Sequence, residues 1–470
     1  MQRDNSNIVA YLAFSLNEGI GQGHKKVDKE TEGRLAQAFG EACSKQNFRE
    51  GNGYIMAFDG KAYKLIDDKT IESIIVQVLE ERKAGIVYTV NSVTAIRRHI
   101  ERKIVKPFLP KKHLIAFDNC VLDMEKNQTF SFDESLQTNI CMSFDYDPKA
   151  DCPRFKSFLN DVLPDSDTLR ALQEFCGAMF VDRRKYKIEN IMYLVGTGQN
   201  GKSTFATTLQ YLLGSENYTS FEVEDLTRQS TREYNIATMN GKLANICTDM
   251  SKGDISGGKF NTLVSGENVM GRFAFGRPFT ASELPLIIAN VNEIPVTTDH
   301  TFAHHRRPIP IPFRVRISDE KKDMELSYKL EQEVSGIFNW VYEGRQRFIK
   351  NRGKFTESEL IKEEKEKIRI ESNSVLQFLD FKEYSPKDSA GATKLWISVK
   401  EIYEDYIDFC KEWGKKNMFE KVNMGKILLM DGYEATRNSR GRGYVVYMGG
   451  KTWEERQKEV KDDLPADLPF

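Results

Sequence analysis

The alternation of apolar and polar residues changes character near the middle of the chain. A continuous apolar run over 191–195 gives way to a loop rich in glycine. Beyond the loop, apolar residues return at helical spacing as far as Gly214: Phe205, Leu209, Leu212 and Leu213. This pattern predicts a buried strand, a tight loop and an amphipathic helix that ends at Gly214.

The residues before this unit predict a small α+β region followed by helices. An alternating run from Tyr54 to Leu65 turns at Asp59-Gly60, which predicts a hairpin, and a helix is expected from about Lys69 to Arg82. Apolar residues from His113 to Asp123 indicate a further strand and turn. A helical collar is expected from Cys152 to about Asp182.

The residues after the loop predict more buried strands and then a separate C-terminal part. The strand candidates are 241–249 and 284–290, and a charge-dense helix is expected over 350–372. Three helices and a pair of strands with a basic, glycine-rich loop follow, and this combination fits a winged helix. The predicted fold class is therefore an α/β phosphate-loop core between an α+β N-terminal domain and a C-terminal winged helix.

Composition and charge limit the possible classes of protein. A chain of 470 residues is too long for one hydrophobic core, and its net charge of −1 means that any DNA contact must come from local basic patches. The chain has neither an apolar run of about 18 residues nor a signal-peptide core, so a cytoplasmic location without a membrane partner is expected. Its seven cysteines lack metal-ligand spacing, which indicates reduced thiols.

The loop itself has the G-x4-G-K-[ST] pattern of a phosphate-binding loop. Its glycines let backbone N–H groups surround an anion, and the following helix directs its positive end at the same place. The lysine supplies a charge for the outer phosphates, and the serine hydroxyl can ligate magnesium. The expected cofactors are ATP and Mg²⁺, bound by Gly196, Gly198, Asn200, Gly201, Lys202, Ser203 and Thr204.

Four further residues supply the remaining chemistry expected of a nucleotide enzyme. Asp249 follows a buried strand and is expected to hold magnesium or to orient the attacking water, while Asn290 ends the next strand and can hold that water. Arg306 and Arg307 precede a proline-rich strand. An arginine placed there is expected to stabilise transition-state charge in the site of a neighbouring subunit.

Taken together, these motifs resemble the superfamily III helicases of the AAA+ ATPases, in the branch of poxvirus and satellite-phage primase-helicases. Within that branch, the chain looks like the self-loading replicative helicases of staphylococcal pathogenicity islands. Residues from about 110 to 450 carry the resemblance, including Ser265-Gly266-Glu267 and the hairpin-like stretch 271–279. The resemblance implies a homo-hexameric ring that moves 3′-to-5′ on single-stranded DNA after recognising origin duplex DNA.

The expected DNA contacts lie in two regions. The resemblance implies that the hairpin grips single-stranded DNA through Arg272, Phe275 and Arg277, with Lys259 nearby. The basic C-terminal hairpin is expected to reach duplex phosphates through Arg437, Arg440 and Arg442. A third basic segment, 95–112, fits either a solvated helix face or a phosphate-contacting patch.

The expected domains are 1–110, 111–182, 183–349, 350–372, 373–450 and an acidic tail over 451–470. The tail ends in Asp-Leu-Pro-Phe, which resembles the tail of bacterial single-strand DNA-binding proteins, and it is expected to bind host replication proteins. A frayed acidic terminus remains the other interpretation.

The expected function is an ATP-dependent replicative DNA helicase and replication initiator of a mobile genetic element. Two alternatives stay open. The first is an ATP-binding origin-recognition protein without a robust motor, because Asp249 stands where many relatives have Glu. The second is a bifunctional primase-helicase, although the region before residue 110 has no zinc-ribbon cysteine set.

Overall fold

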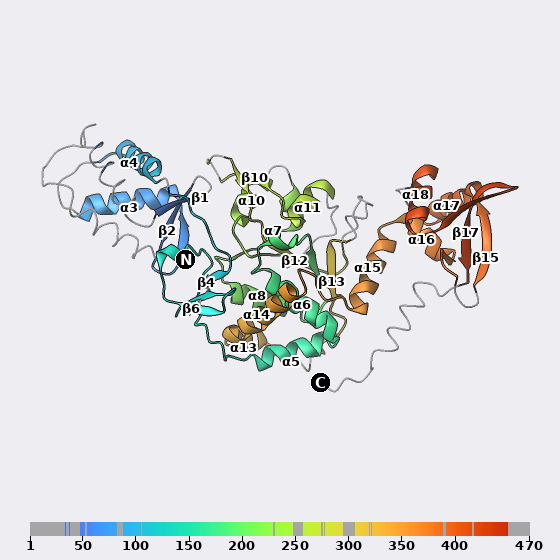
Figure 1. Cartoon of the computed structure of the whole chain (residues 1–470), viewed down its shortest axis with the longest axis horizontal. Helices are drawn as coiled ribbons and strands as arrows, with labels where there is room; N and C mark the ends of the chain where they lie inside the picture. Colours follow the sequence, from blue (N-terminus) through green and yellow to red (C-terminus); the bar gives the residue numbers. More distant parts are fainter. Residues whose placement is uncertain are drawn as a thin grey trace.

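The computed structural model describes residues 48–449 with short gaps, and Gly33 and Gln37 besides. The gaps are 52–53, 82–87, 105, 229–230, 248–256, 274–275, 277, 295–305, 319, 321, 389–391 and 416–417. Three parts follow one another along the longest axis of the molecule: a small N-terminal part, a central part built on a parallel sheet, and a C-terminal part (Figure 1). Among the described residues, no helix is long and apolar enough to cross a membrane.

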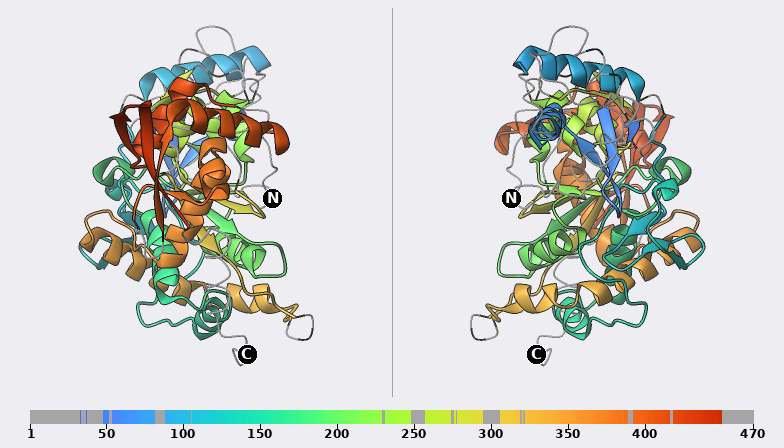
Figure 2. Two further views of the ribbon diagram at one scale, coloured as in Figure 1. Left: turned by 90° about the vertical axis from the view of Figure 1, so that its right-hand side faces the viewer. Right: turned by 90° about the vertical axis from the view of Figure 1, so that its left-hand side faces the viewer.

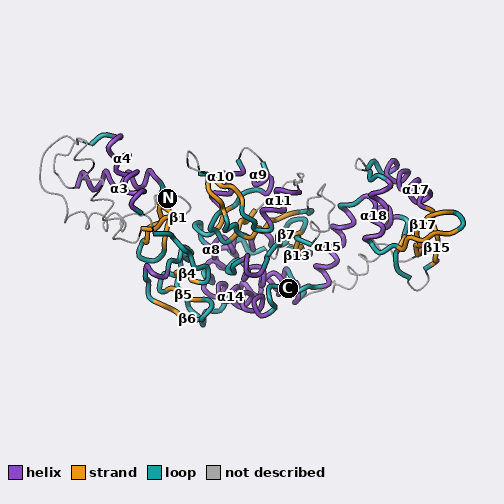
Figure 3. Tube along the Cα trace, turned by 45° about the horizontal axis from the view of Figure 1, so that its top comes forward, coloured by secondary structure: helices purple, strands orange, loops and turns teal. Residues whose placement is uncertain are grey.

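From Phe48 to Lys103, the described residues of the N-terminal part form a three-stranded antiparallel sheet and two helices. Strands β1 (Phe48–Gly51), β2 (Tyr54–Phe58) and β3 (Tyr63–Ile66) pair in sequence order, and the predicted hairpin is confirmed. Helices α3 (Asp68–Glu81) and α4 (Val90–Lys103) lie together beyond the strands (Figure 3). Apolar residues from both helices and all three strands form a core of their own.

Residues 106–178 join this part to the central sheet. A small antiparallel sheet consists of β4 (Leu114–Ala116), β5 (Val121–Asp123) and β6 (Gln128–Phe130). The expected helical collar is present as α5 (Pro153–Val162) and α6 (Ser166–Ala178). Proline at the first position of α5 and an Asp165 cap on Thr168 at the start of α6 set where these helices begin.

Five strands of the described residues, all parallel, form the central sheet. Their order across the sheet is β13 (Pro308–Pro312), β7 (Ile191–Val195), β12 (Leu286–Val291), β9 (Ala244–Cys247) and β8 (Tyr218–Thr219). The predicted strands are therefore confirmed, but β12 lies between β7 and β9. Strand β12, which carries Asn290, is therefore the direct neighbour of β7, the strand that leads into the loop.

The proline spacing of β13 explains why it is an edge strand. Pro308, Pro310 and Pro312 alternate with two isoleucines, and prolines have no N–H to donate. Only the isoleucine N–H groups can enter a ladder, and β13 pairs with β7 alone. Helix α15 (Glu359–Glu371) packs along β13, so this charged segment covers the sheet edge and buries Ile361 there.

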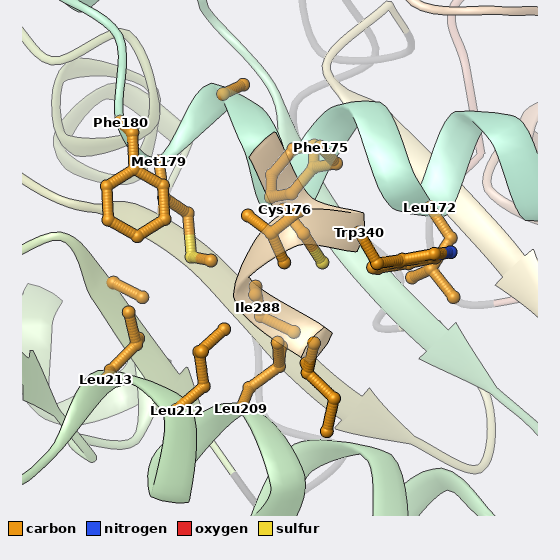
Figure 4. Close-up of a cluster of buried hydrophobic side chains, with 14 of the residues drawn as sticks. Leu172, Phe175, Cys176, Met179, Phe180, Leu209, Leu212, Leu213, Ile288 and Trp340 are labelled. Atoms are coloured by element: carbon orange, nitrogen blue, oxygen red, sulfur yellow. The ribbon is translucent and has the colours of Figure 1, made fainter. Parts of the chain in front are cut away.

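One face of the sheet is covered by α8 (Lys202–Leu213), α6 and α14 (Val334–Lys350). Figure 4 shows leucines of α8 and Ile288 of β12 meeting Phe175, Cys176 and Trp340. The opposite face packs on α9 (Val223–Thr227), α10 (Arg232–Met239) and α11 (Gly257–Val264), and on the hairpin of β10 (Val269–Gly271) and β11 (Phe279–Ala281).

Helices α6 and α14 approach so closely that only glycine fits where they cross. A Cβ at Gly177 would lie 2.1 Å from the backbone nitrogen of Arg345, and a Cβ at Gly344 would lie 2.1 Å from the Gln173 carbonyl oxygen. Replacing Gly177 with alanine should therefore force the helices apart and destabilise the fold by about 1–3 kcal/mol or more. Thermal unfolding followed by far-UV circular dichroism measures the effect.

The matched control for that substitution is Gly258→Ala in α11, where an added Cβ would have no atom within 4 Å. Because alanine favours helix by up to about 1 kcal/mol over glycine, this variant should unfold at or above the wild-type temperature. Equal melting temperatures for the two variants would contradict the close helix crossing.

The C-terminal part has its own core, to which every helix and the long strands contribute. Figure 2 shows this part from its own end of the molecule. The three predicted helices and the predicted strand pair are present, but the sequence pattern did not predict β14 and β15. The elements are α16 (Ser374–Phe381), β14 (Tyr384–Ser385), β15 (Thr393–Ser398), α17 (Val399–Glu412), α18 (Lys421–Met430), β16 (Glu434–Asn438) and β17 (Gly441–Met448).

Candidate functional site

The loop between β7 and α8 is built from left-handed backbone conformations. Gly198 has φ 105°, Gln199 has φ 52° and Gly201 has φ 86°. An added Cβ at Gly198 would meet nothing within 4 Å, so the backbone conformation there, and not lack of space, favours glycine. Asn200, whose φ is not positive, precedes the left-handed Gly201, and such a change of hand between neighbours can direct successive N–H groups toward a common centre, as in an anion-binding nest.

A different constraint acts at the first glycine of the loop. A Cβ on Gly196 would lie 2.0 Å from the Asn200 amide nitrogen and 2.6 Å from the Phe313 carbonyl oxygen. The Asn200 amide donates to that carbonyl at 3.1 Å. Asn200 therefore fastens the loop to the residue that follows β13, and this holds the loop at the carboxyl edge of the sheet.

Lys202 and the first turn of α8 provide the positive end of the site. The Lys202 side chain is almost completely buried, and its ammonium donates to the Gly196 carbonyl inside the loop. Ser203 is exposed. Helix α8 begins at Lys202, after Gly201 as its N-cap residue, and among the described residues no side chain caps its first N–H groups. Uncapped N–H groups beside a buried ammonium suit a phosphate ligand, so the residues present fit a nucleoside triphosphate.

Asn290 adds an unusual feature next to this loop. Its side chain is 4% exposed, yet neither the amide nitrogen nor the amide oxygen has a hydrogen-bond partner among the described residues. Leu286 and Ile288 of the same strand belong to the core beneath α8, so strand alternation puts Asn290 on that face. An unpartnered buried amide costs about 1–3 kcal/mol, which indicates a position reserved for a ligand or a water.

Some predicted site residues lie outside the described residues, and others lie on or against helices that cover the face of the sheet opposite α8. Asp249 follows β9 but is not described, nor are Phe275 and Arg277. Arg272 is described, and it lies against α10 through Glu233 and over the ring of Tyr234. Lys259 is exposed on α11.

The two arginines, of which one is predicted to act on a neighbouring site, lie at the opposite edge of the sheet from the loop. The Ile191 N–H, at the start of β7, donates to the Arg307 carbonyl at 3.1 Å, whereas Gly196 follows the end of the same strand. Five parallel-strand residues, roughly 17 Å, separate the two edges. Arg306 and Arg307 are therefore remote from the loop of their own chain.

Arg306 and Arg307 differ in their surroundings. Arg306 has a side chain 53% exposed, which forms an ion pair with Glu189. Arg307 is 8% exposed and donates to the Ser265 hydroxyl at 3.1 Å. Arg306 is therefore accessible from outside, while Arg307 fastens the Ser265 turn to β13.

A buried arginine that the sequence pattern did not single out organises this same edge. Arg183, in α7 (Arg183–Tyr186), donates to the carbonyls of Val264, Leu284, Pro285 and Ile188. Burial lowers the pKa of Arg183 to about 10, and four carbonyl acceptors compensate for its lost hydration. Arg183 thus joins the segments that lead into β7 and β12.

The basic C-terminal hairpin presents all three predicted arginines to solvent. Arg437 of β16 and Arg442 of β17 are direct cross-strand partners, and Arg440 lies in the connecting turn. Two like charges placed opposite each other destabilise a strand pair by themselves. A polyanionic ligand such as a nucleic acid backbone would relieve this repulsion.

Aromatic residues join the N-terminal sheet to the hairpin of β10 and β11. The Tyr54 ring of β2 meets Phe273 edge-on at 4.8 Å between centroids and Phe279 at 6.0 Å. A Cβ on Gly276 would lie 2.3 Å from the Tyr54 hydroxyl, so the hairpin fits closely around this ring. The stretch predicted to grip DNA is thus packed on the N-terminal part.

Comparison with known proteins gives two partial family matches. Residues 19–164 match the family described as D5 N terminal like, and residues 194–307 match a family of unknown function, DUF5906. Neither match covers half of the chain. The first agrees with the broader resemblance, a phage-type primase-helicase family, and leaves the pathogenicity-island branch untested.

The chain is also similar to solved structures of the NrS-1 C terminal region. One apo form matches with a TM-score of 0.46 and 11% identity over 86% of this chain and 96% of that chain. A second, of residues 305–718, matches with a TM-score of 0.47 and 11% identity over 84% and 94%. Likenesses this distant indicate no function.

Proposed function

We propose that this chain is an ATP-dependent replicative DNA helicase and replication initiator of a mobile genetic element. In this proposal its centre is an AAA+ core of superfamily III, which works as a hexameric ring on single-stranded DNA. The observation that carries the proposal is the left-handed glycine loop around Lys202, beside the unpartnered amide of Asn290. The D5 N-terminal-like match supports the replication class.

In the proposed site, each residue has one task toward ATP. Lys202 and the first N–H groups of α8 bind the phosphates, and the amide of Asn290 orients the attacking water near the terminal phosphate. Ser203, with Asp249, would hold Mg²⁺, which supplies charge neutralisation of the phosphates when it is bound. The orphaned amide of Asn290 supports this assignment because a buried amide without a partner is unfavourable, and the buried ammonium of Lys202 places a positive charge within the loop.

The position of the arginine pair supports the proposed ring. Arg306 lies at the edge of the sheet away from its own loop, and its exposed ion pair with Glu189 contributes little, about 0–1 kcal/mol, so it opens readily. We assign Arg306 as the finger that enters the neighbour's site, and Arg307 as the residue that positions it through Ser265. A head-to-tail interface that repeats this contact closes into a ring when its rotation divides a full turn evenly.

Strand displacement on a forked DNA duplex tests the proposed function. The wild-type chain should separate the strands and hydrolyse ATP faster when single-stranded DNA is added, and Lys202→Ala should do neither. ATP turnover without strand displacement would instead identify an origin-binding ATPase. Primer synthesis on a single-stranded template would identify a primase-helicase.

We further propose that the C-terminal part is a winged helix that binds origin duplex DNA. The order helix, strand, two helices and hairpin supports this assignment, with α18 as the helix that enters the major groove. Lys421 and Lys426 are exposed on α18, and the sequence pattern did not select either of them. The arginines of the β16–β17 hairpin would contact the flanking phosphates.

Alanine at Arg437, Arg440 and Arg442 together should weaken duplex binding at least tenfold. The slope of log affinity against log salt should also become shallower, by about 0.9 for each phosphate that the variant no longer neutralises. The measurement is fluorescence anisotropy on origin and random duplexes over a range of salt concentrations. Because phosphate contacts carry no sequence information, both duplexes should lose affinity alike.

The control for this variant removes two exposed charges from the same part of the chain, Lys400 and Lys411 of α17. Both lysines have carboxylate partners on their own helix, Glu404 and Asp408. Their substitution should leave the salt slope near its wild-type value. A control that loses as much affinity as the arginine variant would show that only net charge matters.

A further inference from the structure

Residues just after β13 are bound to the outside of the phosphate loop by four contacts. The Phe313 N–H donates to the Val195 carbonyl at 2.8 Å, and the Ile317 N–H donates to the Gln199 carbonyl at 2.8 Å. Asn200 donates to the Phe313 carbonyl, and Arg316 donates to the Gln199 side chain. These contacts hold the segment 313–317 against the loop.

Arg316 is the one cation on this segment that has no described acidic partner. Its guanidinium donates through Nε and Nη2 to the Gln199 amide oxygen, both at 3.3 Å, and the side chain is exposed. By contrast, Arg314, two residues earlier, is paired with Glu364 at 3.0 Å and Glu363 at 3.7 Å. A full positive charge is thus held at the loop by a neutral partner.

We propose that Arg316 is a further nucleotide-binding residue, which acts on the phosphates bound in the loop of its own chain. Two of its donors are occupied by Gln199, and the rest of the guanidinium fork remains for phosphate oxygens. Gln199 has a left-handed backbone within the loop, so the bond from Arg316 also fixes a conformation that glutamine disfavours. This inference rests on the proposed function and adds a second cation, beside Lys202, from the same subunit.

The test is the affinity of the full chain for a fluorescent ATP analogue and for ADP. Arg316→Ala should weaken binding of both by about tenfold or more, the size expected for a lost hydrogen bond to a charged group. Arg316→Lys should recover part of the affinity, because it restores the charge without the fork. Gln199→Ala, which keeps the arginine and removes only its tether, should have the smaller effect.

The control is Arg170→Ala, which removes an exposed arginine of α6 that is paired with Asp167 and should leave affinity unchanged. Wild-type affinity in Arg316→Ala would overturn the inference while Lys202→Ala still lost binding, and the proposed function would stand. If the wild-type chain bound no nucleotide, the proposed function itself would fail. Equal losses in Gln199→Ala and Arg316→Ala would assign Arg316 a purely structural role, and this would also overturn the inference.

Discussion

Arg306→Ala is expected to lower ATP turnover by about 10³–10⁵ while nucleotide affinity stays close to that of the wild-type chain. The physical reason is that Arg306 lies at the far edge of the sheet from its own loop, so it does not contribute to binding there. Its guanidinium would stabilise charge only in the transition state of a neighbouring site. Steady-state turnover and a nucleotide titration on the same preparation separate the two effects.

Glu189→Ala is the matched control for that prediction. Glu189 is the partner of Arg306 in the exposed ion pair, and its removal leaves the arginine in place. Turnover should stay within a few-fold of the wild-type value. If Glu189→Ala lost as much activity as Arg306→Ala, the ion pair would matter for the fold of this edge, and the role in trans would be wrong.

Lys202→Ala is expected to lower turnover by about 10²–10³, a loss comparable to that of one preorganised donor in other active sites. Because the lysine ammonium is buried inside the loop and its carbonyl partner is a weak substitute for phosphate, nucleotide affinity should fall as well. This simultaneous loss distinguishes it from Arg306→Ala. Isothermal titration with ATP measures the loss of affinity directly.

Lys149→Ala serves as the surface control for Lys202→Ala. Lys149 is exposed and lies in a turn that is far from the loop along the sequence. It should bind and hydrolyse ATP as the wild-type chain does. Retained turnover in Lys202→Ala would mean that the loop is a structural turn, and the nucleotide site would have to lie elsewhere.

Local pattern was enough to predict the loop and its helix. The apolar run, the glycines and the helical recurrence of Phe205 and Leu209 are all properties of neighbouring residues, and β7 and α8 formed where these features indicated. The alternating run that turns at Asp59-Gly60 likewise became β2 and β3. The spacing of apolar residues within such a segment is enough to predict the element, whatever the rest of the chain does.

The sequence pattern could not predict interactions between residues that are far apart in the chain. Nothing local shows that β12 lies between β7 and β9, and this order is what brings Asn290 next to the loop. In the sequence, Arg183 is one of several neighbouring basic residues, a pattern that indicates an exposed side chain. It is nevertheless buried, because carbonyls from three other segments accept its hydrogen bonds. Strand β15 was missed because its residues are at most half-buried and show no clear alternation.

Mixing two inactive variants tests the central claim most directly. Lys202→Ala subunits keep Arg306, and Arg306→Ala subunits keep an intact loop, so mixed rings rebuild complete sites at interfaces of the correct order. With random mixing in equal amounts and independent sites, about a quarter of wild-type turnover should return, since each site needs one specified residue from each of two neighbours. Mixed assemblies that form, as shown by native mass spectrometry, and yet stay as inactive as either variant alone would contradict a site shared between subunits.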